Sequence, residues 1–70
     1  MERQFVESSL ATSVGYDPNT STLEIEFKSN SEVWQYYEVP ENVYHEMMSA
    51  SIGKYFLANI RKKYPDSRVG

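Results

Sequence analysis

The stretch "STLEIEFK", Ser21 to Lys28, decides the fold because its apolar and polar residues alternate. Leu23, Ile25 and Phe27 are apolar, and charged or hydroxyl side chains stand between and beside them. This period of two is typical of a β-strand that packs one face on a core and leaves the other face in water. We therefore expect a strand here, at the centre of the first half of the chain.

Segments with strand character lie on both sides of it. The preceding stretch alternates apolar with small residues, and "DPNTS" between the two is typical of a turn. "SNSE", residues 29–32, is a second turn, and "VWQYYEV", residues 33–39, is rich in β-branched and aromatic residues. The sequence predicts a three-stranded antiparallel meander. In its first strand, Leu10, Thr12, Val14 and Tyr16 alternate with the small residues Ala11, Ser13 and Gly15.

The aromatic residues of the third strand could form the core or a platform for nucleic-acid bases. With residues 29–32 as the loop, Phe27 lies opposite Trp34 and Ile25 opposite Tyr36, and directly opposed residues share a face. This register favours a core role for Trp34 and Tyr36, although a loop one residue longer or shorter would invert the strand.

The other face of the predicted sheet carries Glu24 and Glu26. Their charges would repel a phosphate backbone, so we do not expect RNA to bind on this face. Tyr37 is the aromatic residue that the same register leaves there.

Two helices are expected in the second half. Pro40 suits a first helical position, and Ser51 suits the N-cap of a second helix that runs from Ile52 to about Lys63. The predicted fold is α+β, a three-stranded antiparallel meander followed by two helices packed on one face. Seventy residues allow one domain, residues 1–70, with a mobile tail from about residue 66.

Composition excludes several classes of protein. The chain has no cysteine, so neither a disulfide nor a thiolate-bound zinc can stabilise it. No signal peptide or membrane-spanning run is readable, and we expect a cytoplasmic protein with no membrane partner. His45 is the only histidine, four residues after Glu41 on the expected wet face of the first helix. We predict no catalytic residue, metal or cofactor, and no enzymatic activity.

Charge is distributed unevenly. Residues 1–50 carry nine acidic and two basic residues, whereas residues 51–70 carry one acidic residue and five basic ones. Cations near the end of a helix also oppose its dipole, which is a purely structural explanation for the same pattern. The five basic residues are Lys54, Arg61, Lys62, Lys63 and Arg68.

Short motifs along residues 6–65 stand at positions typical of one family. They are "SVGYD", Val39-Pro40, Val43-Tyr44, Gly53, Tyr55-Phe56, Ile60-Arg61 and Tyr64-Pro65. The chain resembles the KTSC domain, a module found at the C-terminus of some lysyl-tRNA synthetases and as a stand-alone bacterial protein. The Tyr-x-Tyr motif of that family corresponds to Trp34-Gln35-Tyr36 here, while Ile52 and Leu57 depart from the lysine and asparagine typical of it. Its association with a tRNA synthetase implies RNA binding.

Two functions follow from these observations. The first is a small non-catalytic binding module for RNA, either tRNA or single-stranded, with the five basic residues as its contacts. Lys54 and Arg61, seven residues apart, would lie on one side of the second helix, with Lys62 about 80° around it. The alternative is a protein-protein interaction domain with an apolar surface around Met47, Met48, Ile52 and Leu57.

Overall fold

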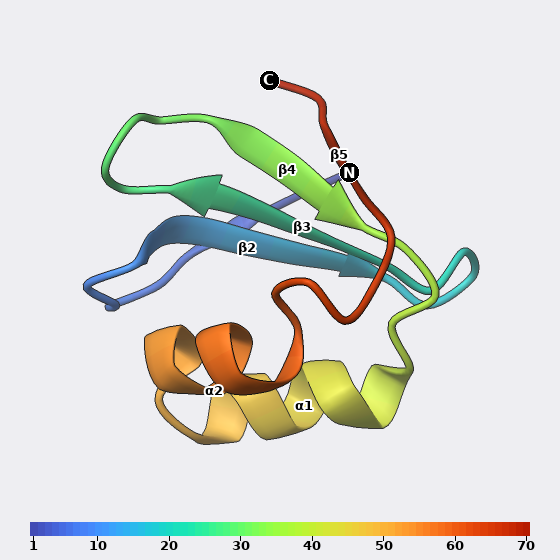
Figure 1. The fold of residues 1–70 in the computed structure, drawn as a ribbon. Helices are drawn as coiled ribbons and strands as arrows, with labels where there is room; N and C mark the ends of the chain where they lie inside the picture. Colours follow the sequence, from blue (N-terminus) through green and yellow to red (C-terminus); the bar gives the residue numbers. More distant parts are fainter.

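The computed structural model describes residues 1–70 as one antiparallel sheet covered by two helices. All five strands belong to this sheet, in the order β1-β2-β3-β4-β5. Both helices lie against one face, and the other face carries no helix (Figure 1). The elements are β1 (Gln4–Phe5), β2 (Ala11–Asp17), β3 (Thr22–Phe27), β4 (Val33–Tyr36), α1 (Glu41–Ser49), α2 (Ile52–Asn59) and β5 (Asp66–Arg68). The α+β class and the packing of both helices on one face are confirmed.

The two edge strands correct the prediction of a three-stranded meander. β1 pairs with β2 through Gln4 and Phe5, and β5 pairs with β4 so that Arg68 lies opposite Trp34 and Asp66 opposite Tyr36. Strands of two or three residues are too short to show an alternating pattern, and their hydrogen-bonding partners come from distant parts of the chain. The tail thus contributes secondary structure, and its mobility stays a prediction.

The register between β3 and β4 differs from the predicted one by two residues. Trp34 lies opposite Ile25, and Tyr36 lies opposite Leu23. The loop consists of residues 28–31, because the backbone N–H of Phe27 donates to the Glu32 carbonyl at 2.9 Å. An even shift keeps every side chain on its predicted face, so Trp34 and Tyr36 do share the helix-facing side of the sheet.

A bulge in β2 changes which of its residues reach the core. The pairing with β3 shifts between Ala11 and Ser13, so Thr12 is the extra residue. Ala11 is therefore fully buried together with Val14, although the two are an odd number of residues apart. Simple alternation could not reveal this because a bulge adds one residue to one strand only.

The core forms where α1 and α2 meet the sheet. Met47 of α1, together with Phe56 and Ile60 from α2 and the turn after it, is fully buried against the strands. The Phe56 ring contacts Phe27 and Tyr36 edge to face, with centroids 5.6 and 5.1 Å apart. These aromatic pairs fix α2 across β3 and β4.

Helix α2 ends earlier than predicted. Asn59 is its last residue, and the N–H groups of Ile60 and Arg61 both donate to the Phe56 carbonyl. Lys62 then takes a left-handed conformation with φ of 64°, which reverses the chain toward β5. Ser51 stands at the N-cap as expected, but its side chain makes no capping hydrogen bond.

A polar network covers the outer face of the sheet. Arg3 donates to Ser13 at 2.9 Å and forms an ion pair with Glu24, and Gln35 donates to Glu24 at 2.8 Å. Burial alone would raise the pKa of Glu24, but its hydrogen bonds to Gln35 and Arg3 and the nearby positive charges outweigh burial and lower it. The acidic character predicted for this face is present, and it is enclosed by the N-terminal segment.

Candidate nucleic-acid interface

A pocket opens at the end of the sheet where β4, the β3–β4 loop and the turn after α2 meet. Its volume is about 470 Å³, within the usual range for small-molecule sites. We call it the Trp34 pocket. Its apolar lining residues are Leu10, Phe27, Trp34, Tyr36, Phe56 and Leu57, and its polar ones are Ser29, Asn30, Glu32, Arg61, Lys62 and Asp66.

Trp34 is held in place by Glu32, just before β4, and through it by Arg68 of β5. The indole Nε1 donates to Glu32 Oε1 at 3.0 Å, and the other carboxylate oxygen of Glu32 lies 3.6 Å from an Arg68 guanidinium nitrogen. The side chain is half-buried, so part of the ring remains accessible. An aromatic ring with a fixed orientation and an accessible surface can stack on a planar ligand.

Only 4% of the Tyr36 surface is exposed, but its hydroxyl oxygen is accessible in the pocket and makes no hydrogen bond within the protein. Burial and the Asp66 carboxylate raise its pKa to about 12, although Arg61 acts in the opposite direction. The hydroxyl is therefore protonated at neutral pH and is free to donate. A polar group that enters the pocket would find this donor unoccupied, close to the charge of Arg61.

The predicted basic residues do not form the expected row along a helix. Arg61 and Lys62 follow the end of α2 and line the Trp34 pocket, and Arg68 lies on β5 beside Glu32. Lys54 is exposed on α2, and Lys63 is exposed in the turn; neither lines this pocket. The geometric reason given for grouping Lys54 with Arg61 and Lys62 is wrong, because the helix ends before it reaches the latter two.

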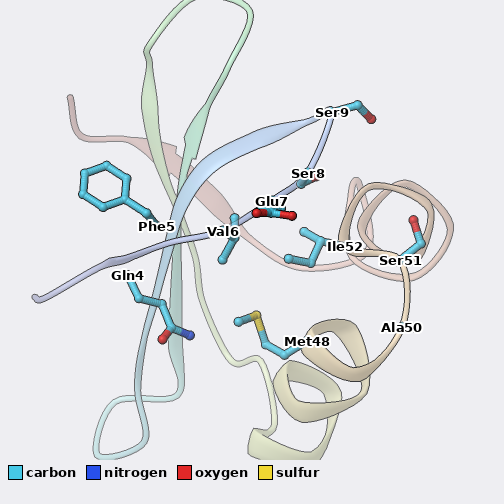
Figure 2. A pocket seen from close by; sticks show the side chains of 10 residues that line it. All are labelled: Gln4, Phe5, Val6, Glu7, Ser8, Ser9, Met48, Ala50, Ser51 and Ile52. Carbon is cyan, nitrogen blue, oxygen red and sulfur yellow. The ribbon is translucent and has the colours of Figure 1, made fainter.

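The apolar surface predicted for a protein partner is also divided. Met47 is fully buried in the core, and Leu57, half exposed, belongs to the Trp34 pocket. Met48 and Ile52 point into a second hollow next to β1, together with Val6 (Figure 2). We call this the β1 hollow.

The acidic and histidine side chains do not gather into a metal-binding cluster. His45 is exposed on α1, and its Nε2 lies 3.3 Å from Glu41 Oε2. No group of three or more histidine, cysteine or acidic side chains could hold a metal ion. None of the helices is long and apolar enough to cross a membrane.

The sequence predicted the chemistry of the Trp34 pocket only in separate pieces. Arg61 and Lys62 were identified from charge, and Trp34 and Tyr36 from the aromatic strand. Nothing in either pattern placed them together, because β5 and the turn at Lys62 bring them together across a gap of 25 residues or more in the chain. Asp66 and the loop residues Ser29 and Asn30 carried no signal at all.

Comparison with known proteins shows the family. The KTSC domain model matches residues 7–64, so the chain belongs to the KTSC domain family. An uncharacterized protein of Stutzerimonas stutzeri (strain A1501) is 39% identical over 57 residues, which cover 80% of this chain and 79% of that protein. The crystal structure of a KTSC domain protein from Yersinia pestis is 40% identical, covers 99% of this chain and 97% of its own, and has a TM-score of 0.93.

Proposed function

We propose that this protein is a non-catalytic module that binds single-stranded RNA at the Trp34 pocket. The observation that carries the proposal is the position of Arg61 and Lys62 at the edge of an aromatic pocket. Proteins that bind single-stranded nucleic acids combine cations along the backbone path with aromatic side chains for the bases. The same two features meet here although the chain as a whole is acidic, with a net charge of −3.

The electrostatic environment supports this assignment. Arg61 and Lys62 form no ion pair within the protein, so their charges are available to a ligand. Lys54 and Lys63 are also unpaired but lie outside the pocket, and they contribute only a diffuse attraction. Arg68 is partly neutralised by Glu32 and acts mainly by positioning Trp34 through it.

Single-stranded RNA fits the pocket better than the helical parts of tRNA do. Bases in an A-form helix are stacked and inaccessible, whereas bases in loops and single strands can turn toward an aromatic side chain. The proposal includes a cytoplasmic location, which is consistent with a chain that has no cysteine.

A titration with an unstructured RNA tests the proposal. If Arg61 and Lys62 each neutralise one phosphate, the logarithm of affinity should fall with the logarithm of salt concentration with a slope of about −1.4. Replacing both residues by glutamine should remove most of this slope. The matched control replaces Lys54 and Lys63 by glutamine, which makes the same change in charge outside the pocket. Equal losses in the two double variants, or no binding by the wild type, would refute the site.

A specific observation also favours the alternative, a protein interaction at the β1 hollow. Phe5 is 86% exposed on an edge strand, and Val6, Met48 and Ile52 line the adjacent hollow on the other side of that strand (Figure 2). A peptide library displayed on phage would test it. Selected peptides should lose binding to a Met48→Gln variant and keep binding to Arg61→Gln, and failure to select any peptide would count against this alternative.

A further inference from the structure

We infer that the Trp34 pocket holds one unstacked nucleotide, with its base against the Trp34 ring and its phosphate on the Tyr36 hydroxyl and Arg61. This inference rests on the proposed function and specifies what enters the pocket. It begins from the Tyr36 hydroxyl, which is accessible at the pocket wall and makes no hydrogen bond within the protein, while the rest of the side chain is buried. A phenol that is held in place by its buried ring and has a free O–H can donate to a ligand oxygen that enters the pocket.

The pocket combines three kinds of recognition. Arg61 and Lys62, after α2, supply positive charge, and Arg61 is close enough to the Tyr36 hydroxyl to act on it. Ser29 and Asn30 of the β3–β4 loop are polar and exposed. The lining also includes aromatic rings, of which Trp34 is oriented by its hydrogen bond to Glu32. A phosphate, the polar edge of a base and the plane of that base match these three groups of residues in turn.

Two acidic residues in the lining limit which ligands can bind. Glu32 is occupied, since one oxygen accepts from Trp34 and the other lies near Arg68. Asp66 forms no ion pair and acts on the Tyr36 hydroxyl, so it opposes a phosphate at the same place. The expected affinity for one nucleotide is therefore low, and removal of the Asp66 charge should strengthen it.

The test uses Trp34, the only tryptophan in the chain, as a fluorescent and NMR reporter. Adenosine 5′-monophosphate is titrated against the wild type, and adenosine and inorganic phosphate are titrated separately. We expect the monophosphate to shift the Trp34 indole signal and to bind more tightly than either part alone. Replacement of Trp34 by leucine should weaken binding by about 5- to 150-fold, the contribution of one stacked base.

Three variants locate the phosphate. Tyr36→Phe removes only the hydroxyl. It should weaken binding of the monophosphate by about tenfold and leave binding of adenosine unchanged. Tyr37→Phe is the matched control, because the Tyr37 hydroxyl donates to Gln35 Oε1 at 3.0 Å on the opposite face of the sheet. This variant should change the affinity for neither ligand. Asp66→Asn should tighten binding of the monophosphate severalfold and leave binding of adenosine unchanged. Circular dichroism of each variant confirms that it is folded.

The outcomes separate this inference from the proposed function. If RNA binds but the monophosphate does not shift Trp34, or if Tyr36→Phe behaves as Tyr37→Phe does, the nucleotide site is wrong and RNA binding stands. If the monophosphate binds as inferred and RNA does not, the nucleotide site stands and the proposed function fails. Binding of inorganic phosphate as tightly as the monophosphate would also overturn the inference, since the base would then contribute nothing.

Discussion

Replacement of Tyr36 by phenylalanine should make the protein less sensitive to alkaline pH. The pKa of Tyr36 is raised from 10.0 to about 12 by burial and by Asp66. A tyrosine is neutral while protonated, so the folded state keeps its proton over a pH range in which the unfolded state loses it. The resulting stabilisation is complete below about pH 10 and is lost as pH rises through about 12.

The size of the effect follows from the shift. Each pKa unit corresponds to about 1.36 kcal/mol, so a shift of two units contributes about 2.7 kcal/mol of unfolding free energy. This is a large part of the stability expected for a domain of this size. The hydroxyl oxygen itself is accessible to solvent, whose screening reduces the contribution, so this value is an upper limit.

Urea unfolding at a series of pH values from about 8 to about 12 measures the effect directly. The wild type should lose up to about 2 kcal/mol more than Tyr36→Phe between about pH 10 and about pH 12. Tyr37→Phe controls for the loss of one phenol from the unfolded chain, which has six tyrosines in all. If the difference in stability between wild type and Tyr36→Phe stays constant across the range, the hydroxyl is not held in the environment that the structure describes.

Three further predictions concern the N-terminal segment and the helix surface. Gly15→Ala would place a Cβ 2.5 Å from the Glu2 carbonyl oxygen; the segment before β1 must then move, and urea unfolding should show a loss of about 1–3 kcal/mol. Arg3→Met leaves the Glu24 carboxylate without its ion pair. An NMR titration should show a higher pKa for Glu24 than in the wild type, and the variant should lose less stability than the wild type when acid protonates this carboxylate. An unchanged pKa would contradict the network. His45→Ala should change stability by less than about 0.5 kcal/mol, and a larger change would show that this exposed residue has a structural role.

The parts of the fold that the sequence predicted are those with a strong local pattern. β3 alternates over its whole length, and α1 follows Pro40 with a clear apolar side, so both were found. β1 and β5 were not found, since two or three residues contain no period and their pairing depends on distant strands. The early end of α2 is also a tertiary effect, because the left-handed turn at Lys62 is needed to bring Asp66 alongside Tyr36.

A core role and a binding role do not divide between the two faces of the sheet. Trp34 and Tyr36 lie on the same face, two residues apart, and face the helices as predicted. Phe56 covers the Tyr36 ring but leaves Trp34 half-buried. One strand can therefore contribute to the core at one position and to a binding pocket at the next position on the same face.

This arrangement depends on the short length of α2. A helix continued to Lys63 would carry Arg61 and Lys62 onward along its axis, whereas the turn after Asn59 places both beside the aromatic rings of β4. The same turn leads into β5, where Arg68 engages the Glu32 that orients Trp34. The pocket and the edge strand thus have one structural cause. A change that straightens the turn, such as Lys62→Pro, which cannot adopt a positive φ, should lose β5 and the pocket together. Loss of one without the other, seen in backbone NMR shifts, would refute this coupling.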